Sequence, residues 1–188
     1  MEEQRHGGGR GVGGLRRRAG TDTGMSVQVF TLPAVTCCRR LCEGHTIAEK
    51  YNAMYDFYGE CVRRGYRLSD EPIFTVSQRR DFLNGYITDE PYPFWVCVPV
   101  RPEKAPTEAV TLPACRALSV LYYGSYAGAD EAFLRLGREV KERGLTPAGD
   151  PRVLGIVAPY TGREIETKRY CSRLVLPVEG EAEASFPV

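Results

Sequence analysis

The stretch Phe30-Thr31-Leu32-Pro33-Ala34 returns about 80 residues later as Val110-Thr111-Leu112-Pro113-Ala114, and self-similarity at a fixed period indicates a repeated structural unit. The segments after the two copies also run in parallel. Each leads through a helical segment and a turn to a Pro-Val ending, Val98-Pro99-Val100 in the first half and Leu176-Pro177-Val178 in the second. The sequence therefore predicts two copies of a unit of about 75 residues. A seam between two such copies is where a ligand pocket tends to form.

Hydrophobic periodicity predicts the elements of the first copy. Residues 26–42 are typical of a strand that is broken or bulged at Pro33, because proline has no N–H to give to a ladder. Apolar residues at three- and four-residue spacing predict an amphipathic helix over 46–64, and strands are expected at 73–76 and 94–100. The expected apolar face of the helix consists of Ile47, Tyr51, Met54, Tyr55, Tyr58, Cys61 and Val62.

The second copy repeats this order. A strand is expected at 109–123, a helix at 129–143, and two strands at 152–157 and 170–178. Each copy is thus strand, helix, strand, strand. The expected fold class is α+β, an internal duplication whose antiparallel sheets carry one long helix each, with a pseudo-twofold ligand cleft between the modules. The apolar face of the second helix consists of Ala132, Phe133, Leu136 and Val140.

The domain organisation follows from the repeat and from composition. Residues 1–24 are rich in glycine and arginine and nearly devoid of apolar side chains, so we expect a disordered leader. Met25 is then a candidate for the natural start of the protein. The rest divides into module one at 25–100, a linker at 101–107, module two at 108–178 and an acidic tail at 179–188.

Charge and cysteine content exclude several classes of protein. The 25 Lys and Arg residues nearly balance the 24 Asp and Glu residues, so no overall field favours nucleic acid or an anionic membrane. No apolar run approaches the roughly 18 residues of a membrane span, and we expect a cytoplasmic protein. The 7 cysteines form no C-x-x-C pair, which predicts reduced, buried thiols rather than a disulfide framework.

Two apparent motifs fail on their context. Gly9, Gly11 and Gly14 satisfy G-x-G-x-x-G, but no strand precedes them, so they do not indicate a dinucleotide site. His6 and His45 are the only histidines. Neither has cysteine partners at zinc-site spacing, and no G-x-S-x-G elbow accompanies them. We therefore expect no metal and no cofactor.

The positive signal is aromatic. The chain holds 11 tyrosines, 7 phenylalanines and 1 tryptophan, and such flat faces with a polar edge suit planar organic ligands, although core packing is the competing explanation. Alternation along 94–100 places Trp95 opposite the apolar face of its strand, and alignment of the copies places Arg173 at the equivalent position. The residues predicted to bind a ligand are Trp95, Arg173, Tyr123, Tyr126, Tyr92, Tyr51 and Glu43.

Four features of the second half resemble one known family. They are Gly124-Ser125-Tyr126, Glu142-Arg143-Gly144-Leu145, the run 148–152 and the ending Leu176-Pro177-Val178. The chain from 25 to 178 is similar to the GyrI-like small-molecule-binding domain, which is also the effector-binding domain of AraC-type and MerR-type multidrug-responsive regulators. The resemblance implies two modules with an aromatic cleft between them, and a stand-alone protein that sequesters or senses a small aromatic, drug-like molecule.

The chain departs from that family at one point. In such regulators a glutamate in the cleft counters cationic drugs, and members often carry it in a closing strand. Trp95 and Arg173 occupy those places here, which leaves Glu43, Glu164 and Glu166 as the acids to consider. Because an arginine repels cations and attracts carboxylates and phosphates, we predict an aromatic or anionic-aromatic ligand rather than a strictly cationic one.

Two other functions stay open at this point. Some members of the family are similar to hydrolases that open strained rings with a cleft carboxylate, for which Glu43 and Glu166 are the candidates here. The absent closing-strand acid counts against an enzyme. A module that inhibits a partner protein, as a gyrase inhibitor does, is the other alternative. The sequence contains no helix-turn-helix pattern, so we expect no direct DNA binding, and any DNA-binding part would lie on another chain.

Overall fold

A single antiparallel sheet of 8 strands and two long helices make up the described part of the chain. The computed structural model describes residues 26–45, 47–78, 90–124, 129–157 and 167–181. The α+β class is confirmed, but one sheet replaces the expected sheet per module. The strands are β1 Val27–Leu32, β2 Val35–Gly44, β3 Phe74–Ser77, β4 Tyr92–Pro99, β5 Val110–Leu112, β6 Cys115–Tyr123, β7 Arg152–Val157 and β8 Cys171–Pro177, and the helices are α1 Ile47–Arg63 and α2 Ala129–Glu142.

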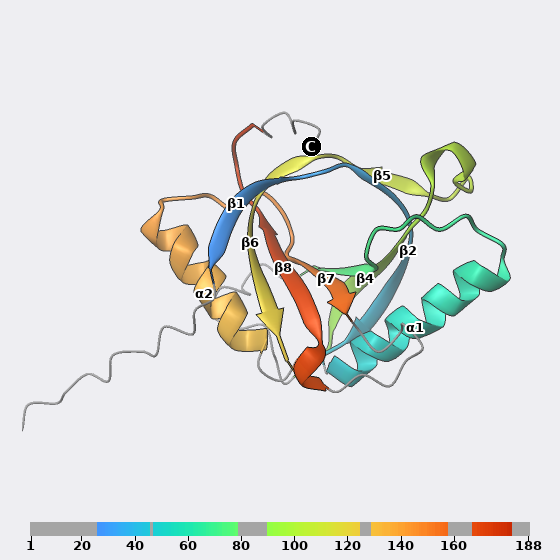
Figure 1. The fold of residues 1–188 in the computed structure, drawn as a ribbon, viewed down its shortest axis with the longest axis horizontal. Helices are drawn as coiled ribbons and strands as arrows, with labels where there is room; N and C mark the ends of the chain where they lie inside the picture. Colours follow the sequence, from blue (N-terminus) through green and yellow to red (C-terminus); the bar gives the residue numbers. More distant parts are fainter. Residues whose placement is uncertain (1–25, 46, 79–89, 125–128, 158–166, 182–188) are drawn as a thin grey trace, which may run out of the picture.

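The sheet is curled, and both helices lie on its outer face (Figure 1). Its strand order is β1-β6-β8-β7-β3-β4-β2-β5. Helix α2 packs against β6 and β8, and α1 against β4 and β2. We call the face opposite the helices the concave face. The predicted leader and nearly all of the predicted tail lie outside the described residues.

Both prolines of the repeated stretch end a strand. Pro33 separates β1 from β2, as predicted, whereas the continuous strand expected over 109–123 is wrong, because Pro113 separates β5 from β6. Neither proline can donate to a ladder. The pairing resumes beyond the break in the same register: Leu32 pairs with Cys115, and Val35 pairs with Leu112. The repeated stretches therefore form a two-stranded ribbon that bends and arches over the concave face (Figure 1).

The centre of the sheet is the antiparallel pair β3 and β7, one strand from each half of the chain. Phe74 pairs with Leu154 and Thr75 with Val153. On either side of this pair the registers agree between the halves, since Cys37 pairs with Pro99 and Ala117 with Pro177. The concave face is thus built from both halves of the chain.

The buried face of helix α1 agrees in part with the one expected, since Met54 and Cys61 were assigned to it and Phe57 was not. Met54, Phe57 and Cys61 are buried against β4. Tyr55 and Val62, assigned to the apolar face from sequence, are 60% and 51% exposed. At 100° per residue these two lie beyond the edge of the stripe that contacts the sheet.

Helix α2 buries the face that its sequence predicts. Ala132, Phe133, Leu136 and Val140 are all buried, in one cluster with residues of β6 and β8. Each helix stops at a glycine with positive φ, Gly65 at 72° and Gly144 at 61°, a conformation that residues with a Cβ avoid. Within the described residues, no helix combines the length and apolar character of a membrane span.

Candidate functional site

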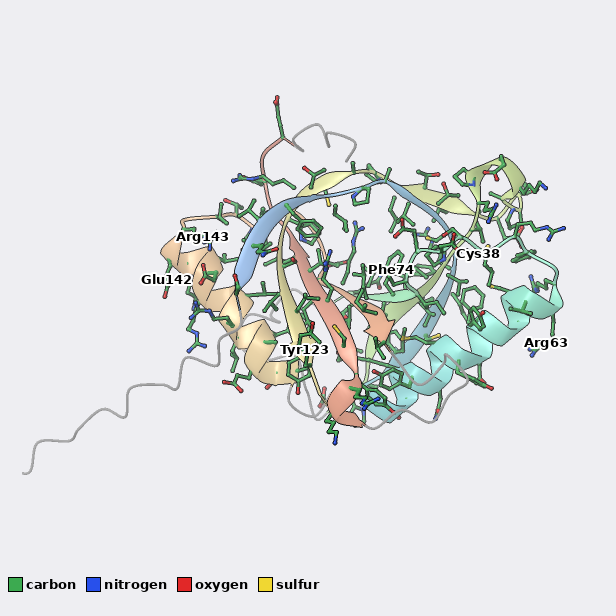
Figure 2. All side chains as sticks on the ribbon, viewed as in Figure 1. Cys38, Arg63, Phe74, Tyr123, Glu142 and Arg143 are labelled. Carbon is green, nitrogen blue, oxygen red and sulfur yellow. The ribbon has the colours of Figure 1, made fainter. Side chains whose placement is uncertain are left out.

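Two rows of side chains cross the concave face from strand to strand. The first row runs from Leu41 through Trp95, Val76 and Arg152 to Val175. The second row begins at Arg39 and crosses the strands in the same order, through Cys97, Phe74, Leu154 and Arg173 to Leu121. Residues two apart on a strand point to the same face, so all of these side chains share the concave side. Figure 2 labels Phe74 over the central strands.

Trp95 lies on this face, as alternation predicts. The neighbouring residues of β4, Phe94, Val96 and Val98, are buried in the cluster beneath α1, whereas Trp95 is half-buried and packs with the concave-face cluster of Cys37, Phe74 and Cys97. Its partners on the adjacent strands are Leu41 and Val76. The indole thus stands between two aliphatic side chains. The guanidinium carbon of Arg39 lies 4.3 Å from the centre of the ring.

Arg173 occupies the corresponding place on β8. It stands between Leu121 and Leu154, and its guanidinium carbon lies 5.6 Å from the ring centre of Phe30. Its Nε is buried and has no hydrogen-bond partner in the described structure. A buried donor without a partner costs free energy, and an acceptor that reached this nitrogen would recover that cost.

A small cavity lies on the concave face, between the arched ribbon and the central strands. The ribbon contributes residues 32–35, the turn before β3 contributes Glu71 and Pro72, and the sheet contributes Phe74, Arg152 and Leu154. Its volume of ≈ 30 Å³ is enough for about one water molecule. The cavity adjoins the row of Trp95 through Arg152 but does not include the indole itself.

Two thiols lie close to Arg39 and Arg152. Cys37 and Cys97 are fully buried on adjacent strands, and their side chains are hydrogen-bonded to each other. This bond lowers the pKa of Cys37, with smaller contributions from Arg39 and Arg152, against the opposing effect of burial. The same bond and burial raise the pKa of Cys97. Arg39 and Arg152 therefore both act on one buried pair in the floor of the site.

The other predicted ligand residues are dispersed. Glu43 is exposed on β2, opposite Pro93, on the concave side. Tyr123 ends β6 and is 66% exposed; Figure 2 labels it at that end of the strand. Tyr92 is buried beneath α1, where its hydroxyl is hydrogen-bonded to Lys50. Three further candidates, Tyr126, Glu164 and Glu166, lie outside the described residues.

Tyr51 belongs to α1, which packs on the face opposite Trp95. The structure therefore brings Trp95, Arg173 and Glu43 to one face of the sheet, with Tyr123 at its margin. Tyr92 lies on the other face, and Tyr51 on the helix that covers it.

The sequence reasoning passed over Arg39 and Arg152. Alternation from the buried Cys37 places Arg39 on the concave face, so that signal was present in the sequence. Its stacking on Trp95 depends on the register of β2 with β4, which puts Arg39 opposite Cys97. No three His, Cys, Asp or Glu side chains are grouped as metal ligands in the described residues.

A second, larger hollow lies away from this face, where α1 ends. It has a volume of ≈ 430 Å³ and is lined by Tyr66, Arg67, Leu68, Arg101, Glu103 and Lys104. The polar lining and the absence of aromatic faces other than Tyr66 set it apart from the concave face.

Comparison of the sequence with protein families and with curated proteins finds no match. Comparison of the structure does. The C-terminal domain of EcmrR matches with a TM-score of 0.68 at 17% identity, over 82% of this chain and 98% of that domain. The fold is GyrI-like. EcmrR in its complex with DNA matches with a TM-score of 0.70 at 16% identity, and this chain spans 57% of its length.

Two further structures share the GyrI-like fold with this chain. SAV2435, whose structure contains tetraphenylphosphonium, matches with a TM-score of 0.50 at 12% identity, over 83% of this chain and 95% of its own. A hydrolase from Listeria innocua has the same TM-score at 11% identity, over 81% of this chain and 91% of that one. Identities this low establish the fold alone.

Proposed function

We propose that this protein binds an aromatic, drug-like small molecule on the concave face, in contact with Trp95, and acts by sequestering or sensing it. The observation that carries the proposal is the half-buried indole between Leu41 and Val76, facing away from both helix cores. A large ring left partly open on a face enclosed by a curled sheet offers stacking area at little cost in side-chain entropy.

The neighbouring structures support this function. EcmrR carries the same fold as its C-terminal domain, and SAV2435 has been seen with a bound aromatic cation. Both are similar to this chain at the level of the fold, and the ligand of neither is assumed for it. They add that the GyrI-like fold can hold an aromatic molecule.

The dimensions of the face fit such a ligand. Trp95 and Arg173 stand on β4 and β8, with β3 and β7 between them. Three strand spacings of about 4.8 Å and an offset of two residues, about 7 Å along the strands, place their backbones about 16 Å apart on a flat sheet. Because the sheet curls toward this side, the side-chain tips approach each other more closely than the backbones. One molecule of two or three fused rings can then contact both.

We further infer that the two halves derive from one duplicated unit and that the ligand lies near the axis that relates them. The matched registers of Cys37 with Pro99 and Ala117 with Pro177 support this origin. The ribbon formed by the two repeated stretches supports it as well, since Leu32 and Leu112 take equivalent places in it.

The test uses the fact that the chain holds 1 tryptophan, so fluorescence excited at the red edge of the absorption band, where tyrosine does not absorb, reports on Trp95 alone. A panel of aromatic compounds comprising a cation, an anion and an uncharged molecule is titrated, and affinity is measured in parallel by calorimetry. We expect at least one member to quench the fluorescence and to lose about tenfold or more in affinity on Trp95→Leu.

The matched control is Tyr55→Leu, because Tyr55 is an aromatic residue that is 60% exposed on α1; its replacement leaves the affinity unchanged. Bound compound in a crystal that makes no contact with Trp95 contradicts the proposal, as does a panel in which nothing binds.

One alternative is favoured by a specific observation. Glu43 places an exposed carboxylate on the concave side of β2, two residues from Leu41, the strand partner of Trp95. A hydrolase is also among the similar structures. A carboxylate can activate water for the opening of a strained ring. Turnover of styrene oxide to the diol by the purified protein, abolished by Glu43→Gln, would establish this activity in place of binding alone.

A further inference from the structure

The indole face of Trp95 is already covered by a cation of the chain itself. The guanidinium carbon of Arg39 lies 4.3 Å from the ring centre, well inside the range of about 6 Å over which a cation is attracted to an aromatic face. Arg39 comes from β2, where it pairs with Cys97, and Trp95 pairs with Leu41. The contact is therefore a diagonal one between adjacent strands.

The position of Arg39 bears directly on which ligands can stack there. Any aromatic molecule that stacks on this face of the ring has to displace the guanidinium, and a cationic one then remains beside a like charge. For an anionic one the displaced guanidinium is a partner, because its N–H groups can donate to a carboxylate or sulfonate. Arg39 thus provides an anion-binding group next to an aromatic surface.

Two further arginines reinforce this charge. Arg152 lies in the row of Trp95, and Arg173 lies in the row of Arg39. In the part of the chain that the structure describes, none of the three forms an ion pair with a carboxylate. The acids near this face are the exposed Glu43 and Glu71. Among the described residues, arginines therefore outnumber acids around the indole.

We propose that Arg39 determines the charge of the ligand, so that the concave face selects aromatic anions bearing a carboxylate, sulfonate or similar group. The inference rests on the proposed binding function and specifies its ligand class. It assigns a role to Arg39, which is two residues from Leu41, the strand partner of Trp95. Arg152 and Arg173 have supporting roles.

The experiment uses naphthalene-2-sulfonate and 2-naphthyltrimethylammonium, which share one ring system and carry substituents of similar size and opposite charge. Affinities for both are measured by calorimetry, so that the readout does not depend on the fluorescence of a tryptophan that Arg39 itself contacts. The decisive quantity is the ratio of the two dissociation constants, compared between the wild-type protein and Arg39→Gln. Comparing ratios cancels the difference in intrinsic hydration of the two probes.

We expect the wild-type protein to bind the sulfonate more tightly than the ammonium, and Arg39→Gln to reduce that preference about tenfold, as one charge at close range in a partly solvated site would. Arg39→Lys keeps the charge and should retain most of the preference. Arg67→Gln is the matched control. It removes the same charge about 17 Å away, five strand residues beyond Trp95, and should leave the ratio unchanged.

The possible results separate charge selection from binding itself. If both probes bind and Arg39→Gln leaves their ratio as it was, Arg39 does not select charge, while the binding function stands. If the wild-type protein prefers the ammonium, the inference is overturned in the same way. If neither probe nor any member of the aromatic panel binds, the proposed function fails and the inference falls with it. Arg39 is exposed, so its variants are expected to fold, which thermal unfolding verifies.

Discussion

Replacing Tyr92 with phenylalanine should destabilise the protein without weakening its binding of aromatic ligands. The Tyr92 hydroxyl accepts a hydrogen bond from the Lys50 ammonium, and both side chains are buried, with Lys50 only 7% exposed. The ammonium also lies 4.4 Å from the ring centre of Tyr92 and 5.7 Å from that of Phe94. Phenylalanine keeps the ring and removes only the acceptor.

The magnitude follows from that difference. A hydrogen bond to a charged group contributes about 1.5 to 3 kcal/mol. We therefore expect Tyr92→Phe to lower the free energy of unfolding by about 2 kcal/mol in urea titrations followed by circular dichroism. Tyr55→Phe is the control, since Tyr55 is 60% exposed and its hydroxyl should contribute less than about 0.5 kcal/mol.

A double-mutant cycle isolates the contact. Lys50→Met removes the buried charge and keeps a side chain of similar length, so Tyr92→Phe should cost much less in the Lys50→Met background than alone. Unchanged stability together with weaker ligand binding would refute this reasoning. It would mean that the Tyr92 hydroxyl reaches the ligand, as its place beside Trp95 in the sequence first suggests.

The remaining predictions concern thiols and the core. Burial raises the pKa of Cys38 to about 12, so at pH 8 only about one molecule in 10⁴ carries the thiolate. Iodoacetamide should therefore alkylate Cys115 long before Cys38, as detected by peptide mass spectrometry. Because the folded pKa lies above the unfolded value, the stability contributed by this thiol is complete below about pH 8.5 and declines as the pH rises toward 12; urea titrations at pH 8 and pH 10 should show a smaller loss in Cys38→Ala than in the wild-type protein. Phe133 is fully buried, whereas its neighbour Leu134 is 40% exposed, so Phe133→Ala should cost about 3 to 5 kcal/mol and Leu134→Ala less than about 1 kcal/mol. Equal losses for the last two would contradict the orientation of α2.

The positions of the helices and most strand positions could be predicted because each depends on a local pattern. The helix at 129–142 has its apolar residues at helical spacing and stops at Gly144, and the strand at 152–157 matches its prediction. The buried face of α1 was predicted less accurately. Its aromatic residues are too numerous for periodicity to separate the buried Phe57 from the exposed Tyr55, since both are apolar enough to satisfy the pattern.

Strand partners could not be predicted from the same signals. A proline indicates that a strand stops, but not that the chain beyond it joins a different part of the sheet. Pro33 has this effect, because β1 pairs with β6 and β2 pairs with β4 and β5. Pairing depends on contacts between residues far apart in sequence, so the single sheet that joins the two halves became visible only in the structure.

For the candidate site, the alignment of the two copies predicted more than hydrophobic periodicity did. It could predict single positions but not which residues contact each other. Alignment places Trp95 and Arg173 at equivalent points because equivalent strands alternate in the same way. Alignment compares single positions, however, whereas the proposed charge selection depends on a contact between two residues, Arg39 and Trp95. Arg39 covers the indole only because β2 and β4 are in a register that makes the two residues diagonal neighbours. At the equivalent place in the second half stands Ser119, which pairs with Val175, so the two halves differ in the residue beside the site as well as in the site itself. The chain therefore concentrates an aromatic face and its covering cation in one half and two further cations, Arg152 and Arg173, in the other. Under the proposed function, this arrangement would orient an asymmetric ligand with its ring toward Trp95.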